Sequence, residues 1–259
     1  MTRFWVGIVI FLCGLVIAWV INYLADVLPI KRRLTKPCCI HCQAERTWLD
    51  YFTFKKCAIC GKAPHIRTWI LYLCVPLGFL FIWLFPNTIG NNGAAQDPVI
   101  DLILKDILLA YFILVSVIDL EYRAILFPVV IFGALYGVVF GVVYHGWLNT
   151  LWGFGTGFGM MLVLYLFGIL FVKFLNRKRA EKLDEDALGF GDVNLSGVLG
   201  LVLGYPGIIA GLFLGIIIGG IGSLFYLVIS RLAGRYKVFT PLPYAPFLIT
   251  GALVLLFIL

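Results

Sequence analysis

Residues 207–230 read GIIAGLFLGIIIGGIGSLFYLVIS, a run without a single charged side chain. An apolar helix needs about 20 residues to cross the hydrocarbon core of a bilayer, so this run predicts a membrane-spanning helix. The whole chain has the same character, because 62% of its 259 residues are hydrophobic and only 13% are charged. This composition is far from that of a soluble globular domain and indicates a membrane protein with several spans.

Seven further apolar runs have the character of spans. They occupy residues 4–29, 69–86, 99–120, 125–145, 150–175, 192–204 and 243–259. The first run is too long for a cleavable signal and lacks a small-residue cleavage site, so we expect it to be a span. The predicted fold is therefore an all-α polytopic membrane protein with about eight transmembrane helices.

The distribution of positive charge predicts the orientation of these spans. All but two of the 20 Lys and Arg residues lie in four segments: 31–67, 121–123, 173–182 and 231–237. The positive-inside rule assigns such segments to the cytoplasm, so both termini are expected outside. The net charge of +7 then reflects topology and contact with the anionic lipid bilayer, and we expect no nucleic-acid partner.

The longest predicted cytoplasmic loop, residues 31–68, contains two CxxC pairs. The pairs are Cys39 with Cys42 and Cys57 with Cys60. Two such pairs can form a tetrahedral thiolate site for Zn²⁺, and the ion would supply folding energy that a short loop lacks. Free thiols are the alternative, and Cys38 competes with Cys39 for the role of ligand. Four cysteines leave no open position for water, so the zinc would be structural.

Two aspartates lie where apolar runs meet loops. Asp119 is at the end of the third predicted span, and Asp192 closes the sequence Gly-Phe-Gly-Asp ahead of the sixth. The predicted orientation assigns both to the cytoplasmic face. Two nearby carboxylates cannot both ionise easily, so one keeps a proton while the other acts as a base. An aspartic protease uses such a pair to cut a peptide bond.

Each aspartate also has a simpler interpretation. Asp192 could cap a helix N-terminus, and Asp119 could form an ion pair with Arg123 one turn later. A proton-coupled transporter is an alternative function, but it predicts carboxylates near the bilayer midplane rather than at span ends. Gly189 and Gly191 would let the backbone approach an unwound substrate strand, so both are candidate substrate-binding residues.

Five landmarks occur in a characteristic order along the chain. Residues 21–29 read INYLADVLP, the double CxxC follows, Asp119 precedes Phe127-Pro128, GxGD leads into a Leu- and Gly-rich helix, and residues 243–248 read PYAPFL. At these residues the chain resembles the type IV prepilin peptidases, the GxGD aspartic proteases of bacterial membranes. The resemblance covers most of the chain.

The resemblance implies a hydrolase of the bacterial cytoplasmic (inner) membrane, an aspartic endopeptidase with Asp119 and Asp192 as catalytic residues. Its substrates would be type IV prepilins, or the pseudopilins of type II secretion, cut at the cytoplasmic face after a basic leader. Many family members also methylate the new N-terminus, so S-adenosylmethionine is an expected cofactor only if a methyltransferase activity is present. A GxGD protease for another single-span substrate is the alternative.

The predicted organisation has three parts. Residues 1–30 form the first transmembrane helix, residues 31–68 form the four-cysteine loop, and residues 69–259 form the membrane-embedded peptidase domain. The sequence indicates no particular oligomeric state.

Overall fold

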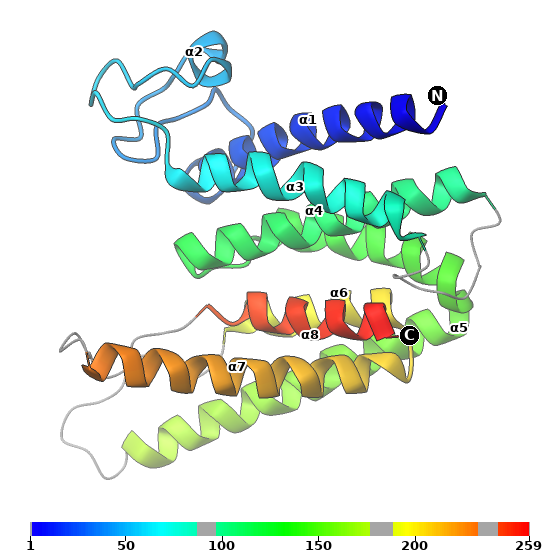
Figure 1. The fold of residues 1–259 in the computed structure, drawn as a ribbon. Coiled ribbons are helices and arrows are strands. Elements are labelled where there is room, and N and C mark those ends of the chain that lie inside the picture. The colour runs from blue at the N-terminus through cyan, green and yellow to red at the C-terminus, as the bar shows by residue number, and fades with distance from the viewer. Residues whose placement is uncertain (1, 87–96, 177–188, 233–242, 259) are drawn as a thin grey trace. The chain divides into compact units, whose positions relative to one another are not determined.

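The computed structural model describes residues 2–86, 97–176, 189–232 and 243–258, and most of these residues are helical, with no strand among them (Figure 1). They fall into two compact units, one ending at Ile118 and the other beginning at Asp119. The predicted all-α membrane fold is confirmed. Parts of two basic segments used to predict orientation, 177–182 and 233–237, lie outside the described residues.

The first unit contains two long helices that pack side by side, α1 (Thr2–Lys31) and α3 (Ile66–Leu84). Gly14 permits their close approach, because a Cβ there would lie 2.6 Å from the Cα of Pro76. The loop between them carries the short helix α2 (Trp48–Phe52). Most of α4 (Pro98–Tyr122) completes this unit.

Near its start, α4 carries a charged group that is shielded from lipid. The ammonium of Lys105 is 3% exposed, lies 2.8 Å from the carboxylate of Asp101 and donates to the carbonyl of Pro86 at 2.7 Å. This pairing one turn apart lowers the cost of a charge inside an apolar helix.

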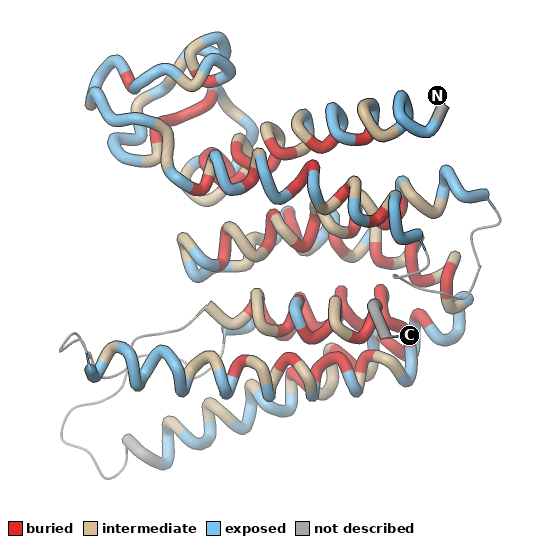
Figure 2. Tube along the Cα trace, viewed as in Figure 1, coloured by how far each residue is buried: buried red, intermediate tan, exposed pale blue. Residues whose placement is uncertain are grey.

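The second unit contains α5 (Phe127–Asn176), α6 (Phe190–Leu203), α7 (Gly207–Leu232) and α8 (Ala245–Ile258). Helix α5 packs on α6, and α7 packs on α8. Figure 2 shows buried residues along nearly all of α6, whereas α7 has long exposed apolar stretches toward its C-terminal end. Exposed Leu and Phe side chains on a helix of this length suit contact with lipid chains.

Four described helices, α1, α3, α5 and α7, are long and apolar enough to cross a membrane, and α6 and α8 are shorter apolar helices. The predicted fourth and fifth spans both lie within α5, where the expected loop at residues 146–149 is reduced to one non-helical residue. Gly146 has a φ of 77° and a ψ of 165°. A positive φ is strained for residues with a Cβ, so glycine is the residue that can make this break.

Glycines bring α5 and α6 into backbone contact. A Cβ at Gly153 would lie 2.2 Å from the carbonyl oxygen of Gly200, whereas a Cβ at Gly155 would meet nothing within 4 Å. Gly153 therefore lies where the two helices are too close for a side chain, as is common for small residues in membrane helices, whereas Gly155 does not.

We expect Gly153→Ala to destabilise the protein by about 1–3 kcal/mol relative to Gly155→Ala, because only the first Cβ forces the two backbones apart. Both variants gain the same helix propensity, so their difference isolates the packing effect. Thermal unfolding of the two purified variants in detergent measures it, and equal midpoints would contradict the packing argument.

Candidate functional site

Asp119 is buried in the last turn of α4, with 4% of its surface exposed. Its Oδ2 atom accepts a hydrogen bond of 3.0 Å from the backbone N–H of Ala245, the first residue of α8. The last turn of a helix disfavours a negative charge, and this donor at the start of another helix offsets that effect. Asp119 and Arg123 interact as charges, but no close salt bridge joins them among the described residues, so such a bridge does not account for the buried carboxyl group.

Asp192 is the third residue of α6 and is 9% exposed. The N-cap of this helix is Gly189, whose position shows that Asp192 is not the cap. The helix begins at Phe190, two residues before the predicted span, which moves Asp192 into the first turn. There the carboxyl group interacts with the backbone of Gly189. A carboxylate in the first turn is favoured by the helix dipole.

The structure brings the two carboxyl groups within electrostatic reach of each other in the second unit. No hydrogen bond between them is present in the part of the chain that the structure describes. Asp192 is also within electrostatic reach of Tyr244, the residue before α8. Asp119 is thus bonded to the start of α8 and Asp192 lies within electrostatic reach of it, a junction that the sequence singled out only through its PYAPFL motif.

The two glycines of GxGD have different surroundings. A Cβ at Gly191 would lie 3.0 Å from the Cβ of Ile125, just after α4, which is tighter than normal packing. A Cβ at Gly189 would meet the Oδ2 atom of Asp192 at 3.4 Å, an ordinary contact. Gly191 thus has a packing reason to lack a side chain, in addition to the substrate contact that the sequence suggests for both.

The four cysteines of the two CxxC pairs converge in the loop of the first unit. Their sulfur atoms all lie within 4.8 Å of one another. The distance is 3.7 Å between the Sγ atoms of Cys39 and Cys60, and again 3.7 Å between those of Cys42 and Cys57. A tetrahedral zinc site with Zn–S bonds of about 2.3 Å has S–S edges of about 3.8 Å. The cysteine cluster is therefore the right size for one zinc ion.

Both CxxC pairs have the same backbone hydrogen bonds. In each, the first cysteine accepts from the N–H four residues later, at 2.7 Å for Cys39 and 2.8 Å for Cys57. Each also donates to the carbonyl five residues later, at 2.9 and 3.0 Å. The residue after the second cysteine has a positive φ in both pairs, Gln43 in the first and Gly61 in the second. Such repeated turns direct the thiols to one point.

Cys38 lies beside this cluster without joining it. Its thiol is buried and donates to the backbone carbonyl of Asp26 at 3.2 Å. Burial is the main cause that raises the pKa of this thiol, which favours the uncharged form. By contrast, backbone N–H groups of Cys60 and Ile59 lower the pKa of Cys57 to about 6. Cys39 is thus the member of the adjacent pair that belongs to the metal-sized cluster.

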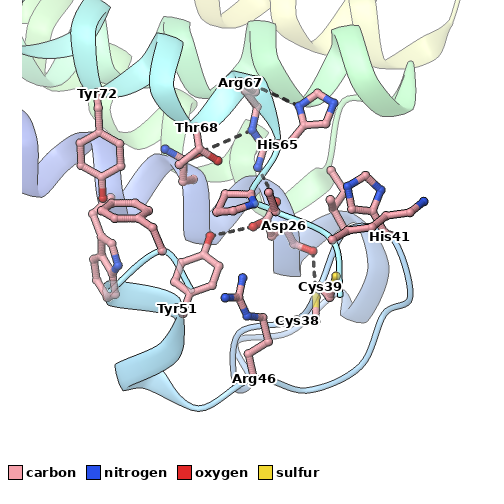
Figure 3. A pocket seen from close by; sticks show the side chains of 17 residues that line it. Asp26, Cys38, Cys39, His41, Arg46, Tyr51, His65, Arg67, Thr68 and Tyr72 are labelled. Carbon is pink, nitrogen blue, oxygen red and sulfur yellow. Dashed lines mark hydrogen bonds and ion pairs between the residues drawn. The ribbon is translucent and has the colours of Figure 1, made fainter. Parts of the chain in front are cut away.

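A buried polar network ties the cysteine loop to both α1 and α3. Figure 3 shows Asp26 of α1 between Tyr51 of the loop and Arg67 of α3. The guanidinium of Arg67 forms an ion pair with Asp26, and the hydroxyl of Tyr51 donates to the other carboxylate oxygen at 2.7 Å. Arg67 also donates to the side-chain oxygen of Asn22 at 3.4 Å. The network forms part of the wall of a pocket that is lined by α1, the cysteine loop and the start of α3.

This network was not predicted from the sequence, although a signal for it was present. Asn22 and Asp26 are polar residues one turn apart at the end of an apolar span, and Arg67 is at the start of the next. An ionisable residue in such a position requires a partner of opposite charge. Asp26 and Arg67 are 7% and 8% exposed, so each neutralises the buried charge of the other.

We expect Arg67→Met to destabilise the first unit by about 3–5 kcal/mol, because it leaves the Asp26 carboxylate buried without its cation. The double variant Arg67→Met with Asp26→Asn removes the unpaired charge and should recover part of this loss. Thermal unfolding in detergent measures both. A double variant no more stable than the single one would show that the ion pair is not the cause.

Comparisons with known proteins give one match. The type IV leader peptidase family matches residues 107–224, somewhat less than half of the chain, and this range includes both aspartates. No curated protein and no solved structure matches the chain. The cysteine loop and the start of α8 lie outside the matched range. The match shows that the region from α4 to α7 is similar to the type IV leader peptidase family, in a chain whose described residues form a helical membrane fold.

Proposed function

We propose that the protein is an aspartic endopeptidase that removes the basic leader from type IV prepilins or pseudopilins at the cytoplasmic membrane face. The observation that carries this proposal is the electrostatic proximity of two buried aspartates, Asp119 and Asp192, from helices far apart in sequence and inside the range matched by a peptidase family. Two interacting carboxyl groups suit the acid–base chemistry of peptide hydrolysis.

In the proposed reaction, one aspartate is ionised and the other carries a proton. The ionised carboxylate takes a proton from a water molecule, whose oxygen attacks the peptide carbonyl. The protonated carboxyl then gives its proton to the amide nitrogen as the C–N bond breaks. Gly189 and Gly191 would leave room for an unwound substrate strand beside the second carboxyl group.

The charge distribution supports the assignment of this site to the cytoplasmic face. Asp119 is followed within one turn by Arg123, and α5 and α7 have basic residues in their last turns, Lys173 and Arg231. By the positive-inside rule these ends are cytoplasmic, with both termini on the opposite side of the inner membrane. A pilin precursor with a basic leader and an apolar helix would present its junction at that face.

The four-cysteine cluster is proposed to hold structural Zn²⁺. The four thiolates Cys39, Cys42, Cys57 and Cys60 would saturate the ion and stabilise the loop, without an open position for water. Methylation of the new N-terminus with S-adenosylmethionine is a separate proposal that rests on the family resemblance alone.

The test is a cleavage assay with purified protein and a prepilin-like substrate that has a basic leader, glycine at the cut and an apolar helix. Mass spectrometry of the product, with S-adenosylmethionine present, should show a new N-terminus after the leader. An added methyl mass would establish the second activity. Failure of folded protein to cut any such substrate would refute the prepilin assignment and favour another single-span substrate.

A further inference from the structure

The start of α8 supplies a backbone donor to the aspartate site. Ala245 is fully buried and is the first residue of α8, so its N–H has no acceptor within its own helix. This N–H donates to Oδ2 of Asp119 at 3.0 Å, across 126 residues of sequence. The bond fixes the plane of one carboxylate and occupies one of its two oxygens.

The two carboxyl groups have different electrostatic surroundings. Asp119 has the Ala245 N–H, the positive end of the α8 dipole and the positive charge of Arg123. Asp192 has the positive end of the α6 dipole and the backbone of Gly189, which also favour an anion, but the one charge that acts on it from the described residues is the negative charge of Asp119. Tyr244, whose phenol is uncharged at neutral pH, is the remaining titratable group at this junction.

Burial disfavours the charged form of both carboxyl groups, and each lies at the start of a helix, α8 for Asp119 and α6 for Asp192, so the neighbouring charges distinguish them: a cation near Asp119 and an anion near Asp192. A hydrogen bond to the charged form and a nearby cation stabilise a carboxylate, whereas a nearby anion favours the protonated acid. We propose that Ala245 is a positioning residue whose N–H holds Asp119 ionised and oriented as the base, so that the shared proton resides on Asp192. This assignment rests on the proposed peptidase function and adds the direction of proton flow.

The direction of proton flow balances over one turnover. Asp119 takes a proton from water as the oxygen bonds to the carbonyl carbon, and Asp192 gives its proton to the nitrogen as the C–N bond breaks. The products are a new carboxyl group and a new amine, with the proton now on Asp119. Transfer of one proton from Asp119 back to Asp192 restores the starting state.

The pH profile of cleavage tests the assignment through Ala245→Pro. Proline lacks the N–H and is well tolerated at the first position of a helix. Loss of a hydrogen bond to a charged group disfavours the ionised base, so the acidic limb of kcat/KM should move up by about 1–2 pH units. The basic limb, which reports the acid, should stay in place. Ala245→Gly keeps the N–H and is the matched control.

A second variant serves if the proline ring does not fit at this buried position. L-lactic acid, incorporated at residue 245 by a misacylated tRNA, replaces only the N–H with an oxygen and adds no bulk. An unmoved acidic limb in either folded variant would overturn the proposal, as would a shift confined to the basic limb. If the unmodified folded protein cuts no prepilin-like substrate, the peptidase function itself fails, and if Asp119→Asn and Asp192→Asn both keep cleaving, the aspartate pair fails. Neither result resembles an unmoved acidic limb, so the failures are distinguishable.

Discussion

Asp119→Asn and Asp192→Asn are each expected to lower the rate of leader cleavage by about 10²–10⁴-fold, because each removes one half of an acid–base pair. Asparagine has nearly the same shape as aspartate and can still accept the N–H of Ala245 through its side-chain oxygen. The variants should therefore insert and fold like the unmodified protein. Cleavage rates measured on equal amounts of folded protein give the comparison.

The matched control for this pair is Glu121→Gln. Glu121 is a carboxylate at the same end of α4, two residues beyond Asp119 and more exposed, and we assign it no part in cleavage. It should leave the rate unchanged. Full activity in either Asp→Asn variant would refute the acid–base pair, whereas absence of cleavage by the unmodified folded protein would return the transporter interpretation to consideration.

Loss of one cysteine is the second change with a large expected effect. Cys60→Ser should reduce bound zinc from about one ion per chain to near zero, because three thiolates do not saturate a tetrahedral site. Structural zinc contributes folding energy directly, so the loop between α1 and α3 should lose its fixed conformation. Metal analysis and limited digestion by trypsin, which cuts after the loop's Lys and Arg residues, report the two effects separately.

Cys38→Ser is the matched control for this experiment. Its thiol donates to the carbonyl of Asp26, and a serine hydroxyl can make the same bond, so zinc content and resistance to trypsin should both persist. Wild-type protein purified without chelators that contains no zinc would contradict the metal proposal. Equal loss of zinc in the two variants would instead show that Cys38 is a ligand.

Local patterns in the sequence were sufficient to predict the helical architecture. Apolar runs of span length correspond to the observed helices, and the spacing of the CxxC pairs anticipated the cluster of four sulfur atoms. The short α6 was predicted because an apolar run lies between GxGD and the turn at Tyr205-Pro206. These features depend on residues close together in the chain, where periodicity and spacing carry the information.

Contacts between distant residues could not be predicted in the same way. The hydrogen bond from Ala245 to Asp119 uses a backbone N–H, which every residue except proline possesses. The residue type at position 245 therefore gives no signal for this bond. The choice between Cys38 and Cys39 depends on which sulfur faces the carbonyl of Asp26. Helix α6 begins at Phe190, two residues before the predicted start at residue 192. Its N-cap is Gly189, which has no side chain to mark the helix start in the sequence.

The buried pair of Asp26 and Arg67 has a consequence for how the protein is made. The two residues are 41 positions apart, and a ribosome adding about 5–20 residues per second needs about 2–8 s to synthesise that interval. Throughout that delay the first helix has emerged with a carboxylate whose cation does not yet exist. Until α3 arrives, Asp26 must therefore either stay hydrated at the bilayer surface or take up a proton, and only the pairing of α1 with α3 allows it to be buried as a carboxylate.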